Sequence, residues 1–261
     1  MIGQASILDW IDKNIENFPH FIVIVAPRGC GKRLLASYIA NKMQATYVRC
    51  GVKVDEVRAI IDSAYTARDK ILYCMEDADT MRAEAKNAML KVTEEPPKNA
   101  YFCMTVEDDS SLLDTIKSRA NVIHLEPYTE IELQEYAKKY DKAIPNLSAA
   151  MSPYEVDMLY KYGEEFVNYV NLVIDNIAEV QPANAFKSGG KLALKNEEDK
   201  YDLKLFFGMF INLCLERLMQ DPLRYANGIK VTSAYYNKVG ILGINKQQLY
   251  DMWVFELREV W

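Results

Sequence analysis

The sequence contains no uninterrupted apolar run of the roughly 18 residues that a membrane-spanning helix needs. Its first residues, MIGQASILDWIDKNIENF, space their apolar side chains like an amphipathic helix and include no signal-peptide core. We therefore expect a cytoplasmic protein without a membrane partner.

Closely spaced cysteines are missing as well. C-x-x-C pairs, which are typical of zinc sites and redox motifs, do not occur among the five cysteines, Cys30, Cys50, Cys74, Cys103 and Cys214. We expect buried free thiols in a reducing compartment, with no zinc and no other metal centre.

The sequence also has no excess of positive charge, since its formal net charge is −6. This balance argues against a global basic field that attracts nucleic acid, and it leaves room for a local basic patch. Apolar residues are plentiful: 50% of the 261 residues are hydrophobic, which is enough for a large globular core.

Short apolar runs alternate with helical patterns in the first half of the chain. FIVIV, residues 21–25, is continuously apolar and rich in β-branched side chains, which favours a strand buried on both faces. Further strands are predicted over residues 46–50, 71–75, 100–105 and 121–125. Helices are predicted over residues 32–43, from Asp55 with its side chain as the cap, and over residues 83–93. The alternation predicts an α/β domain whose parallel sheet has helices on both faces.

Only helical patterns follow residue 126, for example over residues 165–177 and 201–219. Residues 181–200 are polar and contain Gly and Pro, which indicates a linker. The predicted organisation is an α/β domain (1–126), a small helical domain (127–180), the linker (181–200) and a C-terminal helical domain (201–261).

The segment APRGCGKR, between the first strand and the first long helix, matches most of the phosphate-binding pattern G-x-x-x-x-G-K-[ST]. Its glycines would let backbone N–H groups surround a phosphate, and Lys32 would supply a positive charge. Ala26 replaces the first Gly of the pattern, and Arg33 replaces the Ser/Thr whose hydroxyl holds Mg²⁺. We expect a vestigial or weak nucleotide site in which ATP and Mg²⁺ bind poorly or not at all; its residues are Arg28, Gly29, Cys30, Gly31, Lys32 and Arg33. The alternative is a strand-to-helix turn that needs Gly for its shape alone.

Five segments occur in a fixed order between residues 20 and 126: HFIVIVAPRGCGK, VDEVRAIIDSA, MEDADTM, NAMLKVTEEPP and DTIKSR. Together they resemble the clamp-loader branch of the AAA+ ATPases, most closely the delta-prime subunits of the bacterial DNA polymerase III clamp loader. The resemblance implies an AAA+ P-loop NTPase-type parallel-sheet domain, then a small helical lid and a C-terminal helical collar. Many relatives carry a four-cysteine zinc module after the phosphate-loop helix, where this chain has only Cys50.

The resemblance also places the residues that read the nucleotide in such ATPases. The family's Asp-Glu pair after the third strand, the Walker B acids, corresponds to Glu76 and Asp77 in inverted order. The γ-phosphate sensor after the fourth strand falls on Glu107, with Thr105 as the alternative. A carboxylate at that position repels a triphosphate. The lid helix after Gly163 lacks the family's Arg. The acids could also serve only as a solvated strand end or a helix cap.

One functional element is intact. Ser118 and Arg119 match the family's Ser-Arg-Cys motif, with Ala120 in place of Cys. In the family this Arg reaches the ATP of a neighbouring subunit, where a guanidinium stabilises the transferring phosphoryl. The alternative is a surface Arg in the turn before a strand, for which Asp114 is a candidate partner.

The resemblance implies a sliding-clamp loader subunit in DNA replication. Its partners would be other AAA+ subunits in a hetero-oligomeric ring, the sliding clamp and, through the complex, primer–template DNA. The altered nucleotide site predicts a degenerate subunit without efficient ATPase activity of its own, which lends Arg119 to a neighbour. The alternatives are an ATP-hydrolysing motor subunit of the same loader and a non-replicative interaction protein on an AAA+ scaffold.

Two further surfaces are proposed from the sequence. Lys86 and Lys91 are candidates for phosphate contacts with DNA, against the alternative of a solvated helix face. An apolar cluster of the C-terminal domain would form either an interface in the ring or that domain's own core; it comprises Phe206, Phe207, Met209 and Phe210.

Overall fold

A computed structural model of the chain describes residues 3–179, 191–193, 200–239 and 244–261. The chain divides into two compact units, Met1–Glu132 and Leu133–Trp261, and each is described by itself.

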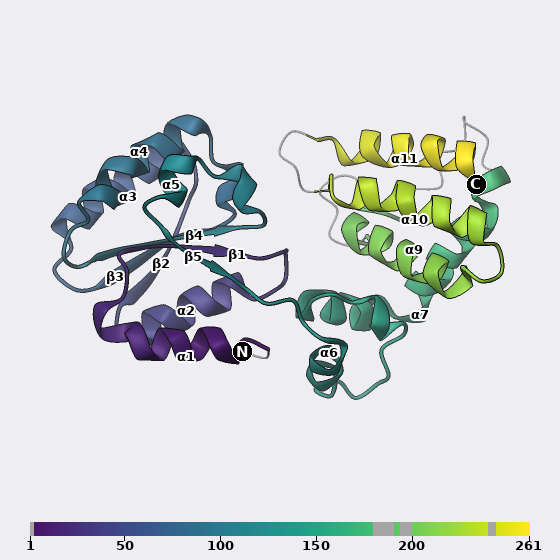
Figure 1. The fold of residues 1–261 in the computed structure, drawn as a ribbon, viewed down its shortest axis with the longest axis horizontal. Helices are drawn as coiled ribbons and strands as arrows, with labels where there is room; N and C mark the ends of the chain where they lie inside the picture. The colour runs from purple at the N-terminus through teal and green to yellow at the C-terminus, as the bar shows by residue number, and fades with distance from the viewer. Residues whose placement is uncertain (1–2, 180–190, 194–199, 240–243) are drawn as a thin grey trace. The chain divides into compact units, whose positions relative to one another are not determined.

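The first unit is built on a five-stranded parallel sheet with the order β2-β3-β4-β1-β5 (Figure 1). The strands are β1 (Phe21–Val25), β2 (Thr46–Cys50), β3 (Ile71–Met75), β4 (Ala100–Val106) and β5 (Asn121–His124). The first three match the sequence prediction to the residue. β4 ends one residue later than predicted and β5 one residue earlier, so the predicted α/β domain with a parallel sheet is confirmed.

Helices cover both faces of this sheet (Figure 1). One face carries α1 (Ala5–Asn14) and α2 (Lys32–Lys42), and the other carries α3 (Val54–Thr66), α4 (Ala83–Glu94) and α5 (Asp114–Lys117). Short 3₁₀ turns complete the unit: η1 (Ile15–Asn17), η2 (Ala78–Thr80) and η3 (Asp109–Ser111).

The two-sided cover explains the composition of β1. Ile22 and Ile24 belong to the core under α1 and α2, whereas Phe21, Val23 and Val25 belong to the core under α3 and α4. All five are buried, because a strand between two helical layers has no solvent face.

The start of α3 differs from the prediction. The helix begins at Val54, so Asp55 lies inside the first turn and does not cap it. Instead the Glu56 carboxylate accepts the backbone N–H of Lys53 at 2.9 Å. A first-turn Glu can satisfy the free N–H at a helix start in this way.

The described part of the second unit is helical. It contains α6 (Glu130–Ala137, which begins at the boundary), η4 (Leu147–Ala149), α7 (Pro153–Asn176), η5 (Ile177–Glu179), α9 (Leu203–Arg217), α10 (Pro222–Tyr236) and α11 (Lys246–Val260). Gly163 has φ 63° and ψ −161° and interrupts α7 with a kink, a backbone conformation that favours glycine. The predicted linker, residues 181–200, lies mostly outside the described residues, and the three-domain division stays a prediction.

The apolar cluster on α9 forms the core of this unit. Its four predicted members, Phe206, Phe207, Met209 and Phe210, are fully buried. The rings of all three phenylalanines pack against Trp253 of α11. The interface interpretation of these residues is therefore wrong, because a fully buried side chain offers no surface to a partner.

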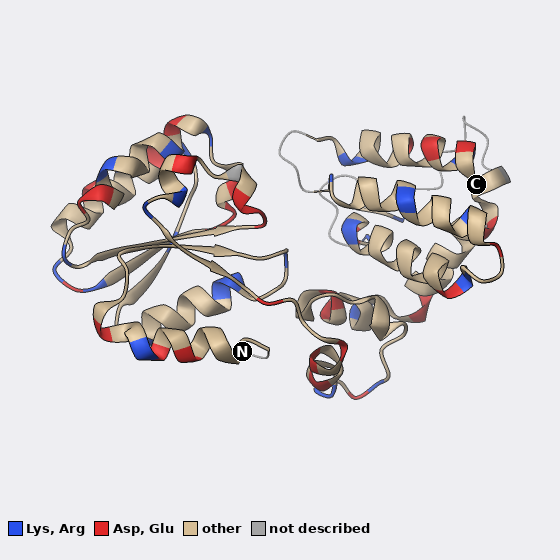
Figure 2. Cartoon of the chain, viewed as in Figure 1, with Lys and Arg blue, Asp and Glu red and all other residues tan. Residues whose placement is uncertain are grey.

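Charges are spread over the surface. In the view of Figure 2, basic residues of the described part are interspersed with acidic ones. Lys86 is buried in α4, which rules it out as a DNA contact and also as part of a solvated helix face, whereas Lys91 is exposed. Within the described ranges, no helix is long and apolar enough to cross a membrane.

Candidate functional site

The predicted nucleotide-site residues meet at one edge of the sheet. β4 lies between β1 and β3, so the carboxyl ends of these parallel strands are neighbours. The loop of residues 26–31 follows β1, Glu76 and Asp77 follow β3, and Glu107 follows β4. Ligands of open α/β sheets bind at this kind of edge.

The loop has the backbone that its glycines predict. Gly29 and Gly31 have φ values of 84° and 89°, a region that side chains other than glycine rarely adopt. α2 begins directly afterwards, and Leu35 N–H donates to the Gly31 carbonyl at 2.9 Å. A strand, a left-handed glycine turn and a helix start are therefore assembled as in a phosphate-binding loop.

Lys32 folds back on this loop. Its Nζ donates to the carbonyl oxygens of Ala26 at 2.6 Å and Pro27 at 3.2 Å. Burial lowers the pKa of Lys32, while the nearby carboxylates of Glu107 and Asp77 act in the opposite direction. The ammonium group is thus held by the loop's own carbonyls, and a phosphate would have to compete with them.

Arg33 lies across the two Walker B-like acids. Its Nε is 2.6 Å from Oε2 of Glu76, and its Nη2 is 3.5 Å from Oδ2 of Asp77. The guanidinium reaches from the first turn of α2 to the end of β3, and it places a fixed positive charge on both carboxylates.

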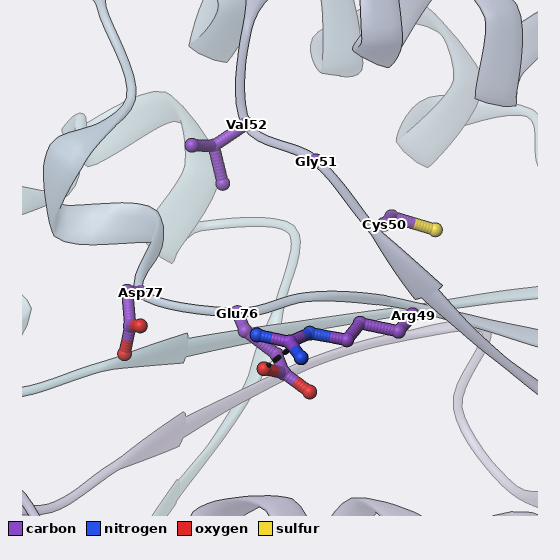
Figure 3. A pocket seen from close by; sticks show the side chains of 6 residues that line it. All are labelled: Arg49, Cys50, Gly51, Val52, Glu76 and Asp77. Atoms are coloured by element: carbon purple, nitrogen blue, oxygen red, sulfur yellow. Dashed lines mark ion pairs between the residues drawn. The ribbon is translucent and has the colours of Figure 1, made fainter.

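Glu76 has two further partners on β2. Arg49 Nε lies 2.9 Å from the same Oε2 atom, and the Tyr47 hydroxyl donates to Oε1 at 3.2 Å. Figure 3 shows Arg49 beside Glu76 in an open recess of about 350 Å³ that Asp77 and residues 50–52 also line. The Glu76 side chain is only 6% exposed, so these cations compensate a charge that burial would otherwise disfavour.

Sequence reasoning did not find Arg49 and Tyr47. The signal for them is the polar content of TYVRC on β2, an edge strand whose end lies beside β3. Only the strand register shows that Arg49 lies near Glu76, because it pairs Arg49 with Cys74, two residues before Glu76.

This donor set does not fit Mg²⁺. The metal prefers octahedral oxygen ligation, which in a phosphate-binding loop includes the Ser/Thr hydroxyl. Here Arg33 stands at that position and its guanidinium contacts the acids. Across the described parts of the chain, no group of three or more His, Cys, Asp or Glu side chains could hold a metal ion.

The two sensor candidates have different surroundings. Thr105 is buried, and its Oγ1 accepts the backbone N–H of Asp77 at 3.1 Å. This bond ties β4 to the turn at Asp77, a non-glycine residue with φ 54°. Glu107 lies beyond the strand, and its N–H donates to Oδ2 of Asp79 at 2.9 Å. Asp79 is a fourth acid at this edge, and the sequence pattern assigned no separate role to it.

Arg119 lies away from this edge, in the turn between α5 and β5. Its Nη1 donates to the Thr115 carbonyl at 2.8 Å and to Ser118 Oγ at 3.4 Å, and its Nη2 donates to Glu94 Oε1. The side chain is 31% exposed. The alternative of a surface Arg in the turn before a strand fits this setting, but its ionic partner is Glu94 and not the suggested Asp114.

The described cysteines do not form disulfides; Cys30, Cys50, Cys74, Cys103 and Cys214 are all buried free thiols. Burial raises the pKa of Cys50 to about 12, which makes its thiolate scarce at neutral pH.

Comparison with known proteins finds a similarity to one family over part of the chain. The family described as "DNA polymerase III, delta subunit" matches residues 49–129, which contain Glu76, Glu94 and Arg119. The delta-prime subunit of Haemophilus influenzae is 36% identical over 88 residues, covering 32% of this chain and 27% of that protein. The gamma subunit of Buchnera aphidicola subsp. Schizaphis graminum is 29% identical over 171 residues, covering 53% of this chain and 47% of that protein. The chain thus spans less than half the length of either relative.

A solved structure shows the same fold. A DNA polymerase III gamma subunit-related protein from Thermotoga maritima superposes with a TM-score of 0.58 over 97% of this chain and 99% of that chain, at 15% identity. This likeness shows the fold, while the sequence matches make part of the chain, including residues 49–129, similar to the clamp-loader subunits delta, delta-prime and gamma of DNA polymerase III.

Proposed function

We propose that this chain is a subunit of a DNA polymerase III-type sliding-clamp loader that does not hydrolyse ATP efficiently and that supplies Arg119 to the active site of a neighbouring ATPase subunit. Its partners are the other AAA+ subunits of a hetero-oligomeric ring, the sliding clamp and, through the complex, primer–template DNA. The family match supports the loader assignment, since it covers both the acids after β3 and Arg119.

The observation that carries the degenerate role is the contact of Arg33 with both Glu76 and Asp77. Two like unit charges about 4 Å apart near a protein surface repel each other by about 4 kcal/mol. A divalent cation facing a guanidinium doubles this repulsion. Mg²⁺ approaching Glu76 would meet two guanidinium groups, because Arg49 contacts the same oxygen. Efficient hydrolysis depends on a correctly held metal, so this arrangement opposes it.

A second candidate is a motor subunit that binds and hydrolyses ATP. The left-handed backbone at Gly29 and Gly31, followed by Lys32 at the helix start, favours it because this geometry suits a phosphate. The two candidates differ in what the isolated chain does with Mg·ATP. Calorimetric titration and a turnover assay separate them, and brisk turnover by the isolated chain contradicts our proposal.

The role of Arg119 is tested in a loader reconstituted from this chain and the ATPase subunits, clamp and primed DNA of its own source. Arg119→Ala should leave assembly unchanged and remove turnover at the site that faces this subunit. Arg58→Ala is the matched control, because Arg58 is an exposed arginine on α3. Failure of the chain to join the loader would favour the non-replicative alternative, and unchanged ATPase with Arg119→Ala would rule out the finger.

A further inference from the structure

We propose that Glu94 is a positioning residue for Arg119: its carboxylate fixes one end of the guanidinium and leaves the remaining donors for an anionic acceptor on another chain. This inference rests on the proposed function of Arg119. It assigns a role to Glu94 in the same site.

The contacts of Arg119 come from two separate elements. Nη1 is bound within its own turn, by the Thr115 carbonyl at 2.8 Å and by Ser118 Oγ at 3.4 Å. Nη2 is bound by Glu94 at the last residue of α4. A guanidinium held from two directions loses much of the rotational freedom that an arginine side chain otherwise has at a surface.

The donor count leaves two donors of Arg119 for a phosphate. A guanidinium has five N–H donors, and the contacts with Thr115, Ser118 and Glu94 use three of them. Among the described residues, no acceptor is bound to Nε of Arg119. Two donors therefore remain, Nε–H and one Nη2 hydrogen, and both can donate to phosphate oxygens.

Glu94 and the turn between α5 and β5, which together hold the Arg119 guanidinium, are both attached to rigid structure. Glu94 ends α4, whose core-facing residues Met89 and Val92 are buried. The turn that carries Arg119 is fixed by Ile116, a fully buried residue whose carbonyl accepts the N–H of Arg119 at 3.1 Å. Precise placement of a reacting group depends on such supporting contacts.

The pair contributes more to orientation than to folding. Glu94 is 50% exposed and Arg119 is 31% exposed, and exposed ion pairs add little to stability. Glu94→Gln should therefore fold normally, while it replaces the ion pair by a hydrogen bond from the guanidinium to a neutral amide oxygen. Glu95→Gln is the matched control, since Glu95 is the exposed neighbour in the sequence and its backbone N–H, which donates to Lys91, stays in place.

The first test uses the isolated chain. Phenylglyoxal modifies accessible arginines, and mass spectrometry of the peptide that contains Arg119 gives the rate at this residue. Glu94→Gln should raise that rate roughly fivefold, the factor that corresponds to the upper range for an exposed ion pair, and Glu95→Gln should leave it unchanged. Equal rates in all three proteins would overturn the inference.

The second test uses the reconstituted loader with ATP. We define the Arg119-dependent ATPase as the difference between loaders containing the unchanged chain and Arg119→Ala. Glu94→Gln should lower the kcat of this activity roughly fivefold with little change in KM for ATP, because Glu94 orients a group that stabilises the transition state. Glu94→Asp, which keeps the charge, should retain more activity than Glu94→Gln.

The outcomes separate the two proposals. Glu94→Gln should have no further effect in the Arg119→Ala background, because Glu94 acts through Arg119. An added effect there, or full activity of Glu94→Gln where Arg119→Ala is impaired, would overturn the role of Glu94 alone. A loader that is indifferent to Arg119→Ala overturns the proposed function and, with it, this inference.

Discussion

Nε of Arg33, in the first turn of α2, lies 2.6 Å from Oε2 of Glu76 at the end of β3. In the usual phosphate-binding loop these two positions cooperate through a metal ion, with a hydroxyl on one side and an acid on the other. Here they contact each other directly, so a covalently attached cation takes the place of an exchangeable one. This relationship can be reversed by mutation.

Arg33→Ser removes the guanidinium and restores the hydroxyl of the phosphate-binding pattern. We expect Mg²⁺-dependent ATP affinity to rise about tenfold, or about 1.4 kcal/mol, because the 56% exposure of Arg33 screens much of its repulsion. Calorimetric titration of ATP with and without Mg²⁺ measures the change. Arg49→Ser is the matched control: it removes the other cation on Glu76 but adds no hydroxyl to the loop, so it should gain less than Arg33→Ser. Equal gains would show that charge removal alone is responsible.

Glu155 makes the second unit sensitive to pH. Glu155 lies in the first turn of α7, and its carboxylate accepts the N–H of Met151, which precedes the helix, at 2.7 Å. Burial raises the pKa of Glu155 above its ordinary value. A group whose pKa is higher in the folded state than in the unfolded state stabilises the fold at pH values below its unfolded-state pKa. That contribution is lost as pH rises through its folded-state pKa. Glu155→Gln, which imitates the protonated form, should therefore have a higher Tm than the unchanged chain at pH 7.5 and a similar Tm near pH 4. Scanning calorimetry at both pH values tests this, and a constant difference would contradict the assignment.

Asp157 is expected to stabilise the contact between α6 and α7. Its two oxygens accept from Tyr136 Oη at 3.1 Å, Lys139 Nζ at 2.9 Å and Tyr140 Oη at 2.7 Å. Asp157→Asn loses the charge and one acceptor, which should cost about 1–2 kcal/mol of unfolding free energy. Asp141→Asn is the control, because Asp141 is an exposed carboxylate bound by a single tyrosine side chain, and it should cost much less unfolding free energy than Asp157→Asn. Urea unfolding of the full chain compares the two variants.

The sequence was most informative where a pattern is local. FIVIV specifies β1 to the residue, because β-branching and continuous hydrophobicity act within one strand. The loop glycines likewise predict their own backbone, since only glycine tolerates those φ values at low cost. These elements can be derived without knowing what lies beside them.

Contacts between distant segments were not predictable in the same way. The partner of Arg119 is Glu94, 25 positions away, and not the nearby Asp114, because the end of α4 lies beside the turn. The helical period that exposes Lys91 buries Lys86, and only the packing of α4 decides which face is covered. An apolar face such as that of Phe206 can likewise be assigned to a core or an interface only when its neighbours, here including Trp253, are known.

Gly228 permits the C-terminal Trp261 to pack on α10. A Cβ built at Gly228 would overlap Cζ3 of Trp261, so the indole would have to move. That indole also contacts the rings of Phe210 and Tyr225, and the Arg224 guanidinium lies 4.6 Å from its centroid. Gly228→Ala should therefore destabilise the chain by about 1–3 kcal/mol, as overpacking usually does.

Gly208→Ala on α9 provides the comparison, because its Cβ would meet Tyr236 at 3.6 Å, an ordinary van der Waals distance. There the gain in helix propensity, up to about 1 kcal/mol, should leave the fold unchanged or more stable. Urea unfolding followed by circular dichroism gives both values. A loss at Gly208→Ala as large as that at Gly228→Ala would mean that helix geometry, and not the indole, sets the requirement for glycine.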